Sequence, residues 1–335
     1  MPSMERESNR IVITGASSLL GAELKLLLEE SKFAGWDFRL LDEEGAAGTL
    51  TEAGGEPAVI QPVEEGSFEN ARFMFFAGSP AFTKINLSAA KQAHGKIVDL
   101  SGALACEGEA TAWFPKLDEL RGSKFPASAT ACAIPSAAGT AAAALALALS
   151  RCGVKRMALQ WFQPVSEAGR AGIEELENQT GQLLSFQSLG QPVFHAQVAF
   201  SMLDHYGAAS AHKLDAVRDR VRAELRACLG SSAVVPSLQV IHAPVFYGTT
   251  FSACAELDPS TDGEKMAKAC ADAGFMLTAH GEAGPNNVSA AGEKAIQLAQ
   301  PKADPAHPGT WWFWGAADNI RLPAWNAVKL AERLA

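Results

Sequence analysis

The sequence predicts an α/β protein with two domains, the first built on a parallel sheet and the second an α+β domain with a larger sheet. The chain has 335 residues, which is enough for two hydrophobic cores. Over residues 1–130, short β-branched and aromatic segments alternate with helical segments, and this order is typical of a parallel sheet. After residue 130, an Ala/Leu helix and longer strands follow, which indicates the second domain.

Composition and charge exclude several classes of protein. Hydrophobic residues make up 48% of the chain and charged residues 19%, an ordinary globular composition. The formal net charge is −9 and there is no run of Lys or Arg, which argues against nucleic-acid binding. Residues 1–7 lack the apolar stretch of a signal peptide, and the apolar run Ala141–Leu149 is too short to cross a bilayer. We therefore expect a cytoplasmic protein without a membrane segment.

The six cysteines show no C-x-x-C pair and no histidine spacing typical of zinc. We expect them to be reduced and mostly buried thiols, and we expect no metal site.

The first strand and turn indicate a nucleotide site. Ile11–Thr14 is predicted to be a buried strand, and Gly15–Gly21 a turn that leads into a helix with leucines at helical spacing. In such a unit, a pyrophosphate lies on the free N–H groups at the helix N-terminus. Ser18 occupies the middle position of G-x-x-G-x-x-G, and its Cβ weakens the fit, so a turn that binds nothing is the alternative. The candidate cofactor-binding residues here are Gly15, Ser17, Ser18, Leu19 and Leu20.

Two further strand ends contribute to the same predicted site. The second strand ends at Asp42, which follows Gly21 by 21 residues, the spacing of the acidic residue that binds a ribose in such units. A solvated turn is the alternative for this acidic segment. The strand Phe73–Phe76 is followed by Ala77 and Gly78, which we also assign to the cofactor site.

The remaining segments are assigned in chain order from their hydrophobic periodicity. In the first domain these are a strand at 38–41, a helix at 82–94 and a strand at 96–100. The second domain is predicted to contain helices at 137–149, 173–186 and 214–229, strands at 157–162, 240–245, 251–256 and 311–314, and a final helix at about 322–334.

Five stretches carry a resemblance to a known family. Gly15–Gly21 is similar to G-A-T-G-x-V-G, and Val165–Leu176 is similar to V-S-G-A-G-x-x-G-x-x-E-L. Pro244–Gly248 is similar to the start of P-V-x-x-G-H, Ala317–Asn319 matches A-D-N, and Asn326–Val328 lies in the last helix. Taken together and in this order, they make the chain resemble the aspartate-semialdehyde dehydrogenase family over nearly its whole length.

The resemblance implies a fold and a reaction. Residues 1–130 become a Rossmann-like dinucleotide-binding domain, rejoined by the C-terminal helix at 317–335, and residues 131–316 become an α+β dimerisation and substrate domain. Family enzymes reduce an acyl phosphate to an aldehyde with NADPH through a cysteine thioester. This chemistry needs a thiolate, a histidine acid/base, cations for the phosphate and carboxylate, and a positioned hydride donor. The resemblance also implies a homodimer, and it adds Asn319 to the cofactor-binding residues.

Most of the catalytic roles fall on residues of the wrong type. The family's cysteine falls on Ser136 and its histidine on Thr249. The two arginines fall on Ala105, for the phosphate, and on His242. The glutamine that holds the thioester carbonyl is retained as Gln163. The chain therefore resembles catalytically degenerate paralogues of the family, without the standard dehydrogenase activity.

Two further positions concern substrate and cofactor. The family's substrate-contacting Glu and the nearby Lys fall near Asp215 and Arg218. The Arg that selects NADP becomes Gly45, which follows the acidic residues Asp42, Glu43 and Glu44. If a dinucleotide binds, we therefore expect NAD rather than NADP.

Two alternatives remain open. One is an active NAD(P)-dependent aldehyde oxidoreductase with rebuilt chemistry, in which Cys132 or Cys254 is the nucleophile and His242 or His195 the base. The other is a non-enzymatic protein-interaction dimer in which the nucleotide crevice is closed.

Overall fold

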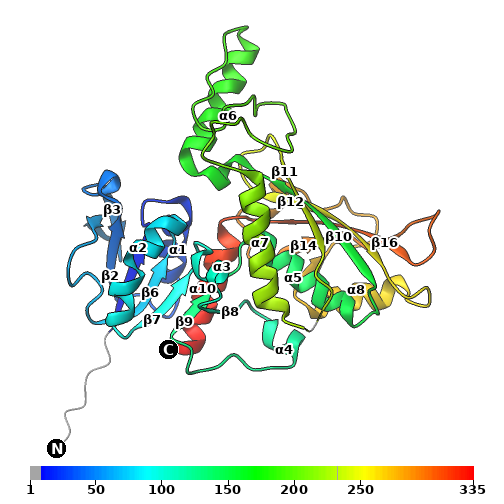
Figure 1. Cartoon of the computed structure of the whole chain (residues 1–335), viewed down its shortest axis with the longest axis horizontal. Helices are drawn as coiled ribbons and strands as arrows, with labels where there is room; N and C mark the ends of the chain where they lie inside the picture. Colours follow the sequence, from blue (N-terminus) through cyan, green and yellow to red (C-terminus); the bar gives the residue numbers. More distant parts are fainter. Residues whose placement is uncertain (1–8, 232) are drawn as a thin grey trace, which may run out of the picture. The chain divides into compact units, whose positions relative to one another are not determined.

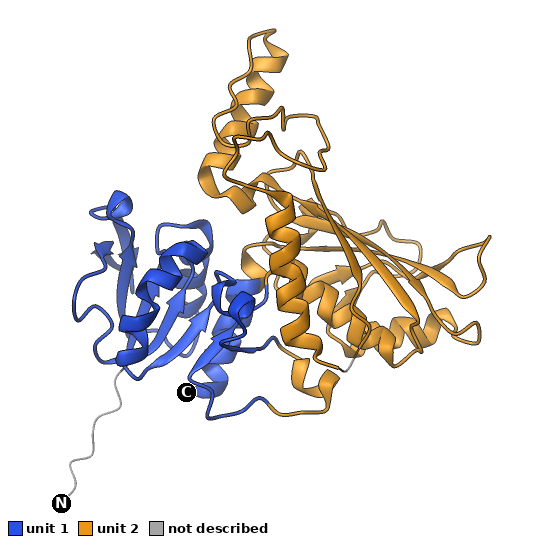
Figure 2. Cartoon of the chain, in the orientation of Figure 1, with its two compact units in different colours: residues 1–114, 125–135, 323–335 blue, residues 115–124, 136–322 orange. Residues whose placement is uncertain are grey.

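The computed structural model describes residues 9–231 and 233–335, and the chain divides into two compact units (Figure 2). Unit 1 contains the described part of Met1–Phe114 together with Phe125–Pro135 and Pro323–Ala335. Unit 2 contains Pro115–Lys124 and Ser136–Leu322. The chain therefore enters and leaves each unit more than once.

Unit 1 is built on a seven-stranded sheet in the order β5-β2-β1-β6-β7-β9-β8 (Figure 1). Each neighbouring pair in this order is parallel, as the sequence predicts. A separate antiparallel pair, β3 and β4, lies outside this sheet. The strands are β1 Arg10–Thr14, β2 Asp37–Asp42, β3 Leu50–Ala53, β4 Glu56–Val59, β5 Gln61–Pro62, β6 Ala71–Phe76, β7 Lys96–Asp99, β8 Thr111–Ala112 and β9 Ala131–Ala133.

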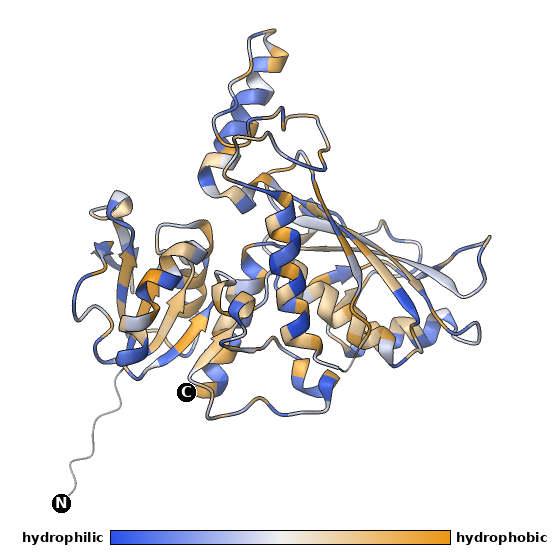
Figure 3. Ribbon diagram, viewed as in Figure 1, coloured by the Kyte–Doolittle hydropathy of each residue, from blue (hydrophilic) through white to orange (hydrophobic). Residues whose placement is uncertain are grey.

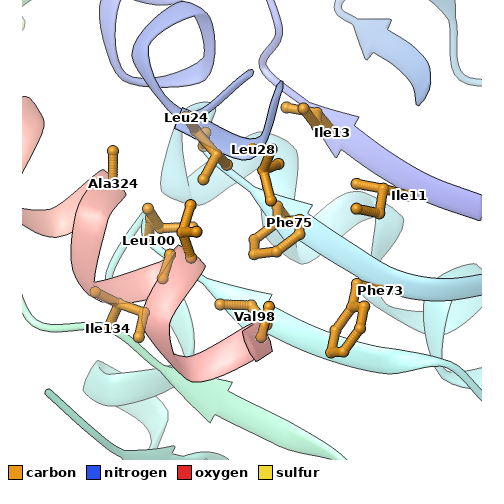
Figure 4. Close-up of a cluster of buried hydrophobic side chains, with 14 of the residues drawn as sticks. Ile11, Ile13, Leu24, Leu28, Phe73, Phe75, Val98, Leu100, Ile134 and Ala324 are labelled. Carbon is orange, nitrogen blue, oxygen red and sulfur yellow. The ribbon is translucent and has the colours of Figure 1, made fainter. Parts of the chain in front are cut away.

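Both faces of this sheet are buried, which explains its continuous apolar strands. Along β1, Ile11 and Ile13 belong to one hydrophobic cluster and Val12 to another. The C-terminal helix packs into the first of these clusters, where Ala324 lies with residues of the sheet and α1 (Figure 4). The helical segments of unit 1 are α1 Leu19–Glu29, η1 Glu44–Ala46, α2 Pro80–Gln92, α3 Ala103–Glu107 and most of α10 Arg321–Leu334.

Unit 2 is built on a mixed sheet in the order β11-β10-β12-β16-β14-β13, with β15 paired to β16. The pairs β10·β11 and β13·β14 are parallel, and β12 and β16 run antiparallel to their neighbours. The strands are β10 Arg156–Gln163, β11 Ser237–His242, β12 Thr249–Glu256, β13 Phe275–Leu277, β14 Ile296–Leu298, β15 Lys302–Ala303 and β16 Thr310–Ala317.

Helix α5 is the centre of unit 2. Every residue from Ala137 to Leu149 is buried, because Ala side chains allow close approach on all sides and the segment carries no charge. Helices α7 and α8 pack against it. The helical segments of unit 2 are α4 Leu117–Arg121, α5 Ala137–Ser150, η2 Val165–Ala168, α6 Gly169–Leu184, α7 Leu214–Leu229, α8 Gly263–Asp272 and α9 Asn287–Ala290.

The four strands β11, β10, β12 and β16 leave one face open. Along β10, Met157, Leu159 and Trp161 are buried, whereas Ala158 and Gln160 are exposed. This alternation is typical of a sheet covered by helices on one side only.

Several element boundaries differ from the sequence prediction. The strand predicted at 240–245 lies at Ser237–His242. The helix predicted from residue 82 begins at Pro80, because the Ser79 hydroxyl caps it by accepting from the Phe82 N–H. The helix predicted at 173–186 begins at Gly169 and ends at Leu184.

The fold predicts a large cost for a side chain at Gly21. A Cβ there would lie 2.1 Å from the Gly15 carbonyl oxygen, so Gly21→Ala must push α1 away from the turn. We expect a loss of about 3 kcal/mol in the free energy of unfolding, measured by urea denaturation. Gly181→Ala is the control, because a Cβ there meets open space. This change lies within α6 and should raise the free energy of unfolding by about 1 kcal/mol. Equal effects of the two changes would contradict the packing argument.

Candidate functional site

The glycine turn of unit 1 is packed against the turn that follows β6. A Cβ at Gly15, whose φ is +73°, would lie 2.2 Å from the Gly78 nitrogen. The Ala77 N–H donates to the Thr14 carbonyl at 2.9 Å, and the Ser18 hydroxyl donates to the Ala77 carbonyl at 3.0 Å. The structure thus brings together Gly15, Ser18, Ala77 and Gly78 at the carboxyl edge of the parallel sheet, where the sequence predicts a nucleotide site.

Ser18 is the N-cap of α1, which explains a serine in place of the middle glycine. Its hydroxyl accepts from the Gly21 N–H at 2.9 Å. The N–H groups of Leu19 and Leu20 have no hydrogen-bond partner among the described residues. These two donors, at the positive end of the helix dipole, are available to an anion.

Asp42 is buried at the end of β2, whereas Glu43 and Glu44, which follow it, are exposed. One carboxylate oxygen accepts from the Ser17 N–H at 2.7 Å and the other from the Glu43 N–H at 2.9 Å. Glu43 is exposed and accepts from the Ser79 hydroxyl at 3.3 Å. Two carboxylates therefore lie at the turn where the sequence predicts ribose binding.

Ser136 is held at the N-terminus of α5 by two hydrogen bonds. Its hydroxyl accepts from the Gly139 N–H at 3.1 Å and donates to a carboxyl oxygen of Glu224 at 2.6 Å. The other oxygen of Glu224 accepts from the Arg220 guanidinium at 3.1 Å. Burial raises the pKa of Glu224 above its usual range, and Arg220 opposes that shift.

Thr249 and Gln163 lie at adjoining positions of unit 2. The Thr249 hydroxyl is buried and donates to the Phe162 carbonyl at 2.6 Å, next to Gln163 along β10. Gln163 is 5% exposed, and its amide oxygen has no hydrogen-bond partner among the described residues. The amide oxygen of Gln163 is therefore available to accept a hydrogen bond from a ligand.

His242 is a fully buried, neutral histidine. Its Nε2 lies 3.2 Å from the Val198 carbonyl, which only accepts, so Nε2 carries the proton. Nδ1 then accepts from the Tyr206 hydroxyl at 3.3 Å. Burial lowers the pKa of His242. Both ring nitrogens are thus occupied, and the ring carries no charge near neutral pH.

Asn319 connects two turns of unit 2. Its amide nitrogen donates to the Ser166 hydroxyl and to a Glu167 oxygen, both at 3.1 Å. Its amide oxygen accepts from the Gly248 N–H at 3.3 Å. In the structure, Asn319 therefore holds two turns of unit 2 together. Its assignment to cofactor binding stays a prediction.

Ala105 lies in unit 1, buried in the short helix α3. Its methyl group provides neither charge nor a hydrogen bond at the position where the resemblance places a phosphate-binding arginine.

Sequence reasoning missed the charged pair at Ser136. Arg218 pairs with Asp215 and Asp219 instead, through side chains that are partly or largely exposed. Hydrophilic and hydrophobic segments alternate along α7 (Figure 3), and Glu224 lies among the helix's buried residues. A carboxylate on the apolar face of a predicted amphipathic helix was the signal that could have identified it.

The cysteines proposed as alternative nucleophiles are poorly suited to that role. Cys132 is fully buried, and burial raises the pKa of its thiol to about 11. Burial also raises the pKa of Cys254, which lies partly exposed on the open face of the sheet. Lys96 lowers the pKa of Cys132, but burial outweighs it, and Asp304 raises the pKa of Cys254 further, so neither thiol is readily ionised.

Within residues 9–231 and 233–335, no group of three or more His, Cys, Asp or Glu side chains could hold a metal ion. In the same part of the chain, none of the helices combines the length and apolar character needed to cross a bilayer.

The buried carboxyl group predicts a specific pH dependence of stability. Because the folded-state pKa of Glu224 lies above its unfolded value, its protonated form favours the fold. That contribution is complete below about pH 4.5 and is lost as the pH rises through the folded-state pKa. As the pH rises from 4 toward 8, the free energy of unfolding of the wild type should therefore fall relative to that of Glu224→Gln, measured by denaturant titration at each pH. Glu177→Gln, at an exposed site on α6, is the matched control, and a difference that does not change with pH would contradict this assignment.

Comparisons with known proteins identify the family. Residues 145–322 match the profile described as "Semialdehyde dehydrogenase, dimerisation domain". The chain is 27% identical over 329 residues to a USG-1 protein homolog of Pseudomonas aeruginosa, and 24% identical over 339 residues to the aspartate-semialdehyde dehydrogenase of Rickettsia conorii. Each alignment covers 97% of both chains. A solved structure of a probable aspartate-semialdehyde dehydrogenase from Pseudomonas aeruginosa matches with a TM-score of 0.85 and 27% identity, over 97% of this chain and 98% of that one. The chain belongs to the aspartate-semialdehyde dehydrogenase family.

Proposed function

We propose that this protein is a dinucleotide-binding member of the family that has lost the phosphorylating dehydrogenase activity. The observation that carries the proposal is the pair of hydrogen bonds made by Ser136. Its hydroxyl oxygen caps α5, and its proton is directed to Glu224. The group at the nucleophile's position is thus part of the packing of unit 2.

The first missing role is the nucleophile. A serine hydroxyl has a pKa far above neutrality and attacks a carbonyl only with an effective base beside it. Glu224 is a poor base here, because its second oxygen is held by Arg220 and its burial disfavours ionisation. An ester on Ser136 would also remove the hydroxyl proton that Glu224 accepts and weaken the cap on Gly139.

The second missing role is the acid/base. The Thr249 hydroxyl donates to a main-chain carbonyl, and threonine cannot exchange a proton near neutral pH as an imidazole does. Loss of a positioned acid/base costs about 10²–10⁴ in rate.

The third missing role is the pair of cations. Ala105 replaces one arginine, and the neutral ring of His242 replaces the other, so neither provides a guanidinium fork for an oxyanion. Arg220 is a cation near Ser136, but it is paired with Glu224. An acyl phosphate would therefore meet less positive charge than the family's reaction requires.

The retained features favour nucleotide binding over a protein-interaction dimer with a closed crevice. The N–H groups of Leu19 and Leu20 are directed out of the start of α1 without partners among the described residues. Gly15 and Gly21 remain glycine, and a Cβ at either position would lie within 2.2 Å of a backbone atom. This close approach of the turn supports the proposal.

We also propose a homodimer formed through the open face of the sheet in unit 2. Trp312 and Trp314 of β16 are 45% and 39% exposed on that face, although both are large apolar residues. Exposed tryptophans on a sheet face are typical of an interaction surface.

Activity measurements test the proposal directly. We expect no detectable phosphate-dependent oxidation of aspartate semialdehyde with NAD or NADP. Because the missing groups act as a unit, Ser136→Cys alone should restore nothing. The combined change Ser136→Cys, Thr249→His, Ala105→Arg and His242→Arg should recover at most a trace. Turnover by the unmodified protein that disappears in Cys132→Ala or Ser136→Ala would overturn the proposal in favour of a rebuilt enzyme.

Calorimetry tests the cofactor preference. Asp42 and Glu43 carry carboxylates at the turn that the sequence assigns to ribose binding, so the 2′-phosphate of a bound NADP would lie near them. Like charges at about 5 Å repel strongly in a partly desolvated site. We expect the dissociation constant for NADP to exceed that for NAD by about tenfold or more. Glu43→Arg should lower the ratio of the dissociation constant for NADP to that for NAD, whereas Glu177→Arg should leave this ratio unchanged. Tighter binding of NADP by the wild type would contradict this prediction.

A further inference from the structure

Unit 1 has a hollow at the amino edge of its parallel sheet, at the opposite edge from the glycine turn. The hollow has a volume of about 360 Å³ and is lined by residues 70–73 at the start of β6, residues 93–96 at the start of β7, and Leu334 of α10. We call it the amino-edge pocket. Strand β6 is six residues long, about 20 Å at the usual rise, and Gly78 lies beyond its other end. The pocket is therefore separate from the predicted nucleotide site.

The amino-edge pocket gathers basic side chains in an acidic protein. Arg72, His94 and Lys96 line it, and the described residues around it include no Asp or Glu. The whole chain has a formal net charge of −9. At the same edge of the sheet, Asp37 is paired with Arg10 at 2.6 Å. Like charges in one hollow repel each other, and an oxyanion between them is attracted to both.

Arg72 is held by Trp36 and by the end of α10. Its guanidinium carbon lies 5.7 Å from the centre of the Trp36 ring, in a cation–π contact. Its Nη2 donates to the Ala335 carbonyl at 3.5 Å, which is long for a hydrogen bond. A stacked guanidinium presents its N–H groups in a fixed plane, and this fork matches a carboxylate or a phosphate. Arg72 is therefore suited to bind an oxyanion.

The other two basic side chains retain hydrogen-bonding capacity. The Lys96 ammonium donates to the carbonyls of Ala129 at 2.7 Å and Ala127 at 3.2 Å, which uses two of its three N–H groups. The His94 imidazole is exposed and has no hydrogen-bond partner among the described residues. Both side chains can therefore donate to a ligand.

The walls of the pocket are fixed by backbone packing and are partly apolar. A Cβ at Gly95 would lie 2.2 Å from the Ala71 carbonyl oxygen, so the turn before β7 packs directly on the start of β6. Phe73 is buried, and its ring packs edge-on against Phe33 with the centroids 5.7 Å apart. The volume lies in the range of small-molecule sites, and preformed walls reduce the cost of binding.

We propose that the amino-edge pocket binds a small organic oxyanion, a compound with a carboxylate or phosphate group and a short apolar part. The oxyanion lies between Arg72 and Lys96, and the apolar part lies against Phe73 and Leu334. This inference is independent of the proposed dinucleotide binding, because the two sites lie at opposite edges of the sheet and share no residue.

Three small probes test the pocket in the whole protein by calorimetry. Phenyl phosphate and benzoate carry the two kinds of oxyanion, and benzyl alcohol carries neither. We expect at least one of the two anions to bind. Benzyl alcohol should bind about tenfold more weakly or worse, because it cannot form charge-assisted bonds with Arg72 and Lys96. Equally tight binding of benzyl alcohol, or no binding of either anion at millimolar concentration, overturns the proposal.

Variants locate the bound anion. Arg72→Gln and Lys96→Gln should each weaken its binding about tenfold. Ala93→Phe fills the hollow without removing a charge and should abolish binding. Lys268→Gln removes a positive charge at an exposed site on α8 of unit 2 and is the matched control. If circular dichroism shows that Arg72→Gln is unfolded, Lys96→Gln and Ala93→Phe decide. Binding that the pocket variants leave unchanged indicates an adventitious ion only and overturns the proposal.

A last variant separates this pocket from the nucleotide site, because an oxyanion could also bind at the N-terminus of α1. Leu19→Pro removes one N–H there, at the first helical position, where proline is tolerated. It should weaken NAD binding and leave the binding of phenyl phosphate unchanged. If Leu19→Pro abolishes phenyl phosphate binding and Arg72→Gln does not, the amino-edge pocket is overturned and the nucleotide site stands. If NAD does not bind while phenyl phosphate binding depends on Arg72, only the dinucleotide proposal fails.

Discussion

The complete burial of α5 is the constraint on which unit 2 depends. A helix covered on all sides leaves no solvent for its terminal N–H groups, so a side chain of the protein must satisfy them. Ser136 does so for Gly139, and its own proton requires an acceptor, which Glu224 provides. Glu224 in turn brings a carboxyl group into the interior, and Arg220 partly compensates for it. The burial of a single uncharged helix thus accounts for a chain of three polar residues at its N-terminus, each of which provides a partner for the one before it.

The same constraint explains why the polar side chains of the candidate site are satisfied within unit 2. Ser136, Thr249 and His242 are buried, and each directs its polar atoms to a partner within unit 2. Polar groups that are satisfied in this way stabilise a structure but have little capacity left for a substrate. Gln163 is different, since its buried amide oxygen lacks a partner among the described residues.

Much of the fold could be predicted because local signals and tertiary packing agree. The parallel sheet of unit 1 follows from short apolar strands between helices, and the burial of α5 follows from its lack of any charged residue. The boundaries could be predicted less well. Caps such as Ser79 decide where a helix begins, and they depend on single hydrogen bonds.

The candidate site was less accessible from sequence. The positions Ser136, Thr249 and His242 came from matching motifs, but their partners are distant in the chain. Glu224 lies 88 residues from Ser136, and no local pattern indicates that the two meet. The tautomer of His242 likewise depends on Val198 and Tyr206, which belong to an irregular loop. The roles assigned to these residues stay predictions.

The cap at Ser136 also restricts which side chains the position accepts. A cysteine sulfur is a weak hydrogen-bond acceptor and its S–H a weak donor, so cysteine at this position would weaken both the α5 cap and the bond to Glu224. Each of these losses is worth about 1 kcal/mol or more. Packing alone therefore favours serine over cysteine here, and a thiol at the start of α5 would leave the Gly139 N–H and the Glu224 carboxyl group in need of new partners.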